Sequence, residues 1–177
     1  MKYNIAIKLP AGMRDKAIEM SKIVVNNGGV FELGAQNNLP HISIAHFECD
    51  DVKNIISIVS DVDDIIKISK TFKLKSDEYR VSKSGWVDVS FHVCEDVIFL
   101  YEQVVGILDK YNCKITSDDW RQKNAPHITF SRIESDEKFN TRLLPSYDFS
   151  FIVDEIELFE RGAHGVCEKE LNIFKLH

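Results

Sequence analysis

Two matching heptapeptides constrain the fold of this chain more than any other feature of its sequence. Residues 39–45 read LPHISIA and residues 125–131 read APHITFS. Both contain, in the same order, a proline, a histidine, an isoleucine, a hydroxyl residue, an apolar residue and a small residue. A helical pattern ends upstream of each copy, near Asn27 and near Tyr111, so the match extends to a helix–loop–strand unit. The sequence therefore predicts an internal duplication.

Each heptapeptide has the alternating pattern of a β-strand with one apolar face. Side chains alternate between the two faces of a strand, so we expect His41 and Ser43 on one face, and His127 and Thr129 on one face of the second strand. If the two halves pack about a pseudo-twofold axis, two imidazoles and two hydroxyls converge on one cleft. One imidazole can then act as a base and the other as an acid, while the hydroxyls donate to phosphate oxygens. This pattern predicts chemistry at a phosphate.

The paired motifs at 41–44 (HISI) and 127–130 (HITF) resemble the signature of the 2H phosphoesterase superfamily. That superfamily includes the 2′-5′ RNA ligase-like proteins and the 2′,3′-cyclic nucleotide phosphodiesterases. The stretch 126–132 is similar to the second motif of the ligase-like branch, and the first and last strands also look like those of the family. One departure is that residues 160–162 (ERG) replace the Arg-Ser pair that ligase-like members often carry.

The resemblance implies that His41 and His127 carry acid–base catalysis and that Ser43 and Thr129 hold the phosphate, without a metal or another cofactor. We therefore expect a metal-independent phosphodiesterase that acts on RNA ends or small nucleotides and opens 2′,3′-cyclic phosphates to 2′-phosphates. Two alternatives stay open: a 2′-5′ phosphodiesterase or RNA ligase activity, and a nucleotide-binding module without catalysis. Which histidine is the acid and which is the base is also left open.

Arg132 and Trp120 are candidate substrate-binding residues. Arg132 can supply a cation to a phosphate, although strict alternation places it on the strand face opposite His127. Trp120 precedes the second motif in an expected loop with Arg121 and Lys123, where an indole can stack on a base. An aromatic residue that only packs as a lid explains Trp120 equally well.

Two further groups of polar residues are interpreted as structural. His46 lies five positions after His41, and alternation places it on the opposite face, which excludes a metal pair between them. Asp88, Ser90 and His92 look like a hydrolytic triad. However, neighbours at i and i+2 on one strand are about 7 Å apart, which is too far for a hydrogen bond between nucleophile and base. We interpret these three as a polar strand face.

The composition favours one compact domain and limits the partners. The chain has 177 residues, 44% of them hydrophobic, and 22 Lys plus Arg against 28 Asp plus Glu, for a net charge of −6. A broad surface for long duplex nucleic acid is therefore disfavoured, whereas a pocket for a small anion is not. No apolar run is long enough to cross a membrane, so we expect a cytoplasmic protein without a membrane partner, acting as a monomer. The four cysteines form no Cys-x-x-Cys pair and are interpreted as ordinary thiols.

Apolar periodicity predicts the α+β class. Three helices are marked by apolar stripes: Met13, Ala17, Met20 and Val24; Val52, Ile55, Ile56 and Val59, after a cap at Asp50 or Asp51; and Val97, Tyr101, Val104 and Leu108. Strands are predicted over 3–9, 41–47, 66–81 with a candidate interruption near Asp77, 86–93, 127–133, 149–160 and 168–176. We expect a single domain over 1–177, made of two pseudo-symmetric lobes whose antiparallel sheets line a central cleft with the helices outside.

Overall fold

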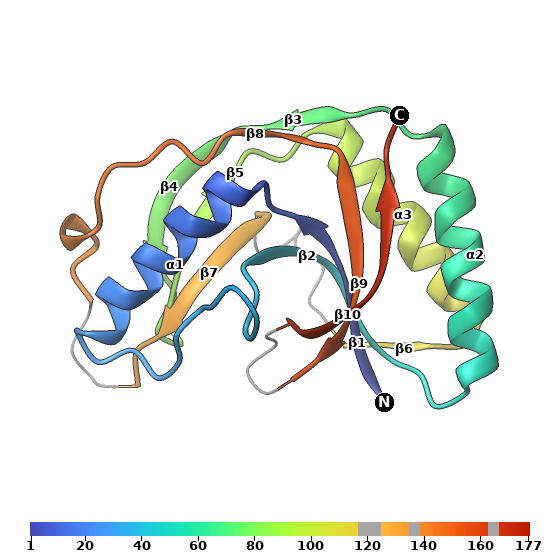
Figure 1. Ribbon diagram of the computed structural model, residues 1–177, viewed down its shortest axis with the longest axis horizontal. Helices are drawn as coiled ribbons and strands as arrows, with labels where there is room; N and C mark the ends of the chain where they lie inside the picture. The colour runs from blue at the N-terminus through green and yellow to red at the C-terminus, as the bar shows by residue number, and fades with distance from the viewer. Residues whose placement is uncertain (117–124, 135–138, 163–166) are drawn as a thin grey trace.

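The structure is a computed structural model that describes residues 1–116, 125–134, 139–162 and 167–177. It confirms the α+β class, with helices and antiparallel strands mixed along the chain (Figure 1). The elements are β1 (Lys2–Lys8), α1 (Ala11–Val25), β2 (His41–Glu48), α2 (Val52–Ile68), β3 (Phe72–Leu74), β4 (Ser76–Val81), β5 (Trp86–Phe91), α3 (Glu95–Lys110), β6 (Lys114–Ile115), β7 (His127–Arg132), a 3-10 helix (Thr141–Leu143), β8 (Phe151–Val153), β9 (Glu155–Arg161) and β10 (Cys167–Lys175).

Two of the antiparallel sheets contain the same three-stranded unit. One sheet has the order β10-β9-β1-β2-β6 and the other has the order β4-β5-β7, while β3 and β8 form a separate pair. In both units a motif strand, β2 or β7, pairs with a central strand, β1 or β5. A third strand, β9 or β4, pairs with the other edge of that central strand. The predicted duplication is therefore present as two equivalent ladders.

The helices cross between the two units. Helix α1 follows β1 in the chain but packs against β7, whereas α3 follows β5 and packs against β2 and β6. Helix α2 packs between α3 and β10. Figure 1 shows this exchange, with α1 beside β7 and with α2 and α3 on the side of the five-stranded sheet. The two sheets are consequently tied to each other by the connections that leave their central strands.

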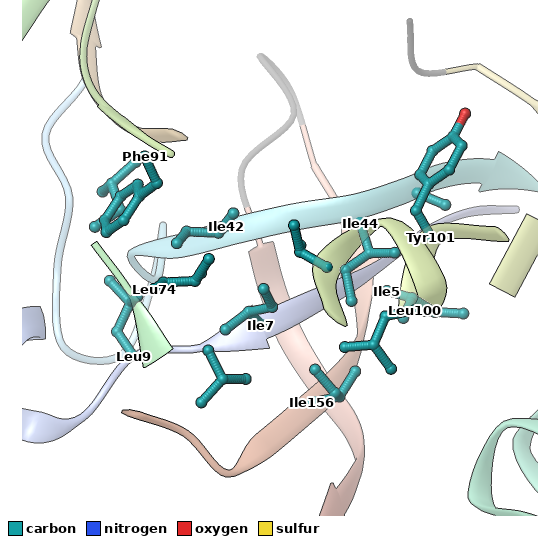
Figure 2. Packing of buried hydrophobic residues seen from close by; sticks show 14 of the residues in the cluster. Ile5, Ile7, Leu9, Ile42, Ile44, Leu74, Phe91, Leu100, Tyr101 and Ile156 are labelled. Atoms are coloured by element: carbon teal, nitrogen blue, oxygen red, sulfur yellow. The ribbon is translucent and has the colours of Figure 1, made fainter. Parts of the chain in front are cut away.

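The apolar residues of the motifs anchor both motif strands in the core. Ile42, Ile44, Ile128 and Phe130 are each at most 1% exposed. Figure 2 shows Ile42 and Ile44 in the same buried cluster as the isoleucines of β1. Each such side chain stabilises the fold by roughly 1.5–3 kcal/mol on burial. With these residues held in the core, the intervening histidines and hydroxyl residues are directed to the other side of each strand.

Helix α2 begins as predicted, but only Ile55 and Val59 of its predicted stripe pack against the core. The carboxylate of Asp51 accepts a hydrogen bond from the backbone N–H of Lys53 at 2.8 Å, which caps the helix. Val52 and Ile56, two members of the predicted stripe, are 64% and 67% exposed. The fully buried side chains of α2 lie in its middle and at its end: Ile58, Val62 and Ile66. The prediction followed the first turn, whereas the core contacts the middle and end of this helix.

Two predicted strands have different limits in the structure. The strand predicted over 66–81 is wrong at its start, because helical spacing continues through Ile66 and α2 ends at Ile68. The rest of that segment divides into β3 and β4. The strand predicted over 149–160 also divides, because β8 pairs with β3 and β9 pairs with β1. In both cases one apolar run of sequence forms two strands that belong to different sheets.

Candidate active site

A β-bulge interrupts β2 immediately after its histidine and serine. In the ladder with β1, Ala6 lies opposite Ser43 and Ile5 lies opposite Ala45, so Ile44 is an extra residue without a partner. Ile44 and Ala45 are both buried, at 1% and 0% exposure. Two successive residues therefore face the core, and the alternation resumes one position late.

Strand β7 has a bulge at the equivalent position. In its ladder with β5, Asp88 lies opposite Thr129 and Val87 lies opposite Ser131, which leaves Phe130 as the extra residue. Phe130 and Ser131 are both fully buried. The duplication thus includes an irregularity of the backbone as well as the sequence motif.

The bulges overturn the predicted placement of His46 and Arg132. Strict alternation placed each of them opposite the histidine five positions earlier, but after the bulge both lie on the histidine face. The ring of His46 shows this directly, because its Nε2 lies 2.9 Å from Oγ of Ser43. A signal was present in the sequence: in both copies two residues suited to burial, 44–45 and 130–131, precede a polar residue.

The two motif histidines are held in the same way. Nδ1 of His41 lies 2.7 Å from the carbonyl oxygen of Leu39, and Nδ1 of His127 lies 2.9 Å from that of Ala125. A carbonyl oxygen only accepts hydrogen bonds, so Nδ1 carries the hydrogen in both rings. The proline between each histidine and its partner is buried and restricts the backbone there. Nε2 is therefore the nitrogen available for chemistry in both histidines.

The two halves bring their histidines close to each other. Strands β2 and β7 contact each other, although they belong to different sheets. Burial lowers the pKa of His41 to about 4, opposed by its hydrogen bond to Leu39 and reinforced by the charge of His127. Burial likewise lowers the pKa of His46 to about 3, with further lowering by the charges of His41, Arg161 and His127. His41 and His46 are therefore neutral at pH 7.

The Ser43 hydroxyl belongs to a hydrogen-bond network that the sequence did not predict. The amide nitrogen of Asn4, on β1, donates to Oγ of Ser43 at 3.0 Å, and His46 approaches the same oxygen from β2. Asn4 is fully buried, and its own Oδ1 has no hydrogen-bond partner in the part of the chain that the structure describes. Thr129, the counterpart of Ser43, is half-buried and lies opposite Asp88.

Solved structures share this architecture along nearly the whole chain, although no protein-family model and no curated protein matches the sequence. LigT of E. coli, in complex with 3′-AMP, has a TM-score of 0.76 at 20% identity, covering 99% of this chain and 97% of that one. A protein of Thermus thermophilus has a TM-score of 0.74 at 15% identity, covering 99% and 98%. The ns2 PDE domain of MHV has a TM-score of 0.56 at 16% identity, covering 99% and 100%. This chain has the same fold as these solved structures.

In this fold, the polar face predicted on β5 lies beside the second motif. Asp88 is opposite Thr129 and Ser90 is opposite His127 in the ladder, and both are buried, at 5% and 1% exposure. The Ser90 hydroxyl donates to the backbone carbonyl of Glu78 at 3.2 Å. His92 lies beyond the end of the strand and is exposed. These positions agree with a polar strand face and not with a triad.

Of the two candidate substrate-binding residues, the structure describes Arg132 but not Trp120. Arg132 lies on the histidine face of β7, but its Nε donates to the backbone carbonyl of Ser84 at 3.0 Å and its guanidinium lies 5.6 Å from the ring centre of Trp86. Trp120 lies outside the described residues, as do the neighbouring Arg121 and Lys123.

The end of β9 supplies a cation that the sequence pattern did not assign. Arg161, at the end of β9, donates from Nη1 to the Thr116 hydroxyl at 3.1 Å, and its charge contributes to the low pKa of His46. Its Nε is buried and has no hydrogen-bond partner within the described residues. Those residues also contain no group of three or more His, Cys, Asp or Glu side chains that could hold a metal ion. No helix among them is long and apolar enough to span a membrane.

Proposed function

We propose that this protein is a metal-independent phosphodiesterase that acts on RNA ends or small nucleotides, opening 2′,3′-cyclic phosphates to 2′-phosphates. One observation carries the proposal: two histidines from equivalent strands have the same ring orientation. Each Nδ1 is bound to the carbonyl two residues before it, and the charge of His127 lowers the pKa of His41. Two imidazoles that lie close together and are held in the same way can divide the proton transfers. One takes a proton from water, and the other gives a proton to the leaving oxygen of the phosphodiester.

The proposed reaction is an in-line displacement at phosphorus. One histidine takes a proton from water, whose oxygen forms the new bond to phosphorus. The bond from phosphorus to the 3′ oxygen breaks, and the other histidine gives that oxygen a proton. Ser43 and Thr129, which lie on the histidine faces of their strands, donate to the non-bridging oxygens as negative charge develops there.

The comparisons support a nucleotide as the kind of substrate. The similar E. coli structures hold 3′-AMP, NADP⁺ and ATP, and another holds phosphate. The ligands 3′-AMP, NADP⁺ and ATP each carry a phosphate group next to a ribose, as the proposed substrate does. A net charge of −6 also favours a local site for a small anion over a long duplex.

Product analysis tests the proposal. The purified protein is incubated with a nucleoside 2′,3′-cyclic phosphate, with a 2′-5′-linked dinucleotide and, in a binding assay, with AMP. We expect release of the nucleoside 2′-phosphate from the cyclic substrate, and loss of that product in the His41→Ala and His127→Ala proteins. Cleavage of the 2′-5′ linkage alone would favour the second enzymatic alternative. Binding of AMP without turnover of either substrate would replace the proposal with a binding module.

A further inference from the structure

The two half-sites have the same backbone but different charges. The bulged ladders define which positions are equivalent: Asp88 lies opposite Thr129 in one half, and Ala6 lies opposite Ser43 in the other. A carboxylate in the second half thus corresponds to a methyl group in the first. The strand position beside each catalytic hydroxyl is therefore anionic in only one of the two ladders.

The positions opposite the histidines differ as well. Ser90 lies opposite His127, whereas Lys8 lies opposite His41. Side chains of directly opposed and diagonal residues in a ladder lie on the same face and within about 8 Å of each other. The central strand therefore presents a carboxylate to the His127 half and an ammonium group to the His41 half.

The carboxylate of Asp88 interacts electrostatically with His127. Burial raises the pKa of Asp88, while the charges of His127 and Arg80 lower it. Arg80, on β4, places Nε and Nη2 each 2.8 Å from Oδ1 of Asp88, so neither contact uses Oδ2. Arg80 binds Asp88 from β4, whereas His127 lies on β7, on the other side of β5. A buried carboxylate in this position stabilises positive charge on the His127 imidazole.

The carboxylates of the first half are held by Lys8. Its Nζ lies 2.7 Å from Oε1 of Glu157, 3.2 Å from Oε2 of Glu155 and 3.9 Å from Oε2 of Glu170. All three glutamates belong to β9 and β10, which are farther from His41 than β1 is. In this half the residue opposite His41 on the central strand is Lys8, which carries an ammonium group and not a carboxylate.

Within the described residues, the other groups whose charges act on His41 or on its neighbour His46 are a guanidinium and imidazoles. The charge of His127, on β7, acts on His41, while Arg161, on β9, acts on the neighbouring His46. None of these groups stabilises a proton on His41. The low pKa of His41, about 4, agrees with this environment.

Resting on the proposed function, we propose that His127 is the general acid and His41 the general base, and that Asp88 is a positioning residue whose carboxylate stabilises positive charge on the His127 imidazole. Nε2 of His41 takes the proton from water, and the water oxygen bonds to phosphorus. The bond to the 3′ oxygen breaks as Nε2 of His127 delivers its proton there. His41 then releases a proton to solvent and His127 takes one up, which restores the starting state.

A substrate whose leaving group needs no proton separates the two roles. Each enzyme is assayed on a nucleoside 2′,3′-cyclic phosphate and on a nucleoside p-nitrophenyl phosphodiester, because nitrophenolate departs without an acid. General acid–base groups contribute about 10²–10⁴ in rate. We expect His127→Ala to lose at least about 100-fold on the cyclic substrate but less than about 10-fold on the nitrophenyl ester. His41→Ala should lose at least about 100-fold on both.

The opposite pattern, with His41→Ala rescued by the nitrophenyl ester, would overturn the assignment, and so would equal losses of both variants on both substrates. Failure of the parent protein to hydrolyse either substrate would instead contradict the proposed function. The two failures are therefore distinguishable.

The role of Asp88 is tested through the titration of His127. In Asp88→Asn we expect the NMR-measured pKa of the His127 ring to fall by about one unit, because an anion that favours the imidazolium is lost. The alkaline limb of kcat/KM should move to lower pH by the same amount. Asp88→Glu should restore much of both values. Asp77→Asn is the matched control, since Asp77 is an exposed aspartate of the same sheet.

Because Asp88→Asn leaves Arg80 as an unpaired charge, the double variant Arg80→Met/Asp88→Asn provides a second measurement. It removes both charges of the ion pair and should retain the parent's fold with a lowered His127 pKa. An unchanged His127 pKa in either folded variant would overturn the role of Asp88.

Discussion

Ser43 and His46 form a hydrogen bond of 2.9 Å between Oγ and Nε2, although they are three positions apart on one strand. In a regular strand such residues point to opposite faces. The bulge at Ile44 removes that difference and leaves both side chains on the site face. Together with the amide of Asn4, His46 holds the oxygen that is proposed to bind phosphate.

Removal of the His46 ring should slow turnover more than it weakens binding. In His46→Ala we expect kcat to fall about 10-fold with a smaller change in KM, because about 1–1.5 kcal/mol of hydrogen bonding to Ser43 is lost. His46→Gln keeps a polar atom near the position of Nε2 and should recover part of the loss. Steady-state kinetics on the cyclic substrate measure this. His177→Ala, an exposed histidine at the end of the chain, is the control. Parent-like kcat in His46→Ala would contradict the role of this contact.

The two hydroxyls should contribute more to the rate than to the fold. We expect Ser43→Ala or Thr129→Ala to lower kcat/KM by roughly 10²–10³, since each removes about 2–4 kcal/mol of transition-state stabilisation. Thermal unfolding should be nearly unchanged for Thr129→Ala, which is half-buried. Ser43→Thr and Thr129→Ser keep the hydroxyl and serve as matched controls. Near-full turnover in both alanine variants would rule out the phosphate clamp.

The pair of histidines should give a rate that falls at both low and high pH. The acid limb reports protonation of the base, and the alkaline limb reports loss of the proton from the acid. Single alanine variants of His41 and His127 should each lose orders of magnitude. The double variant should lose little more than the worse single variant, because the two groups act in one step. A pH–rate profile and the three variants test this, and additive losses would indicate independent roles.

Acid should destabilise the protein through two of its site histidines. The pKa values of His41 and His46 fall to about 4 and about 3 from the ordinary 6.5, so the unfolded chain binds protons more tightly than the folded protein. Stability is therefore lost as pH falls from 6.5 towards 4, by about 3 kcal/mol for His41 alone. Urea unfolding at pH 7, 5 and 4 measures the slope. His41→Gln/His46→Gln should flatten it, and an unchanged slope would show that these groups are not responsible.

Chelation should leave the activity intact. Two histidines perform both proton transfers in the proposed reaction, so no step requires a metal-bound water. Enzyme dialysed against EDTA should hydrolyse the cyclic substrate at the parent rate. Activity that disappears with EDTA and returns with a divalent ion would contradict the two-histidine mechanism.

Local pattern was sufficient to predict that His41, Ser43, His127 and Thr129 lie on the polar faces of two strands, where we propose the active site. The heptapeptides alternate between apolar and polar residues, and burial of Ile42 and Ile128 directs the neighbouring histidines away from the core. The same reasoning gave the wrong face for His46 and Arg132. It treated the strand as regular, and a bulge depends on how two strands pair and not on the residues of one strand alone.

By itself, the sequence determined the α+β class, the duplication and the two motif strands, because these depend on periodicities that a single segment carries. The tertiary structure alone decided that α1 packs against β7, that Asn4 reaches Ser43, and that Asp88 lies beside the His127 half while Lys8 lies beside the His41 half. Each of these relationships joins residues far apart in the chain. Their geometry follows from strand register and from the exchange of helices between sheets, which no local pattern encodes.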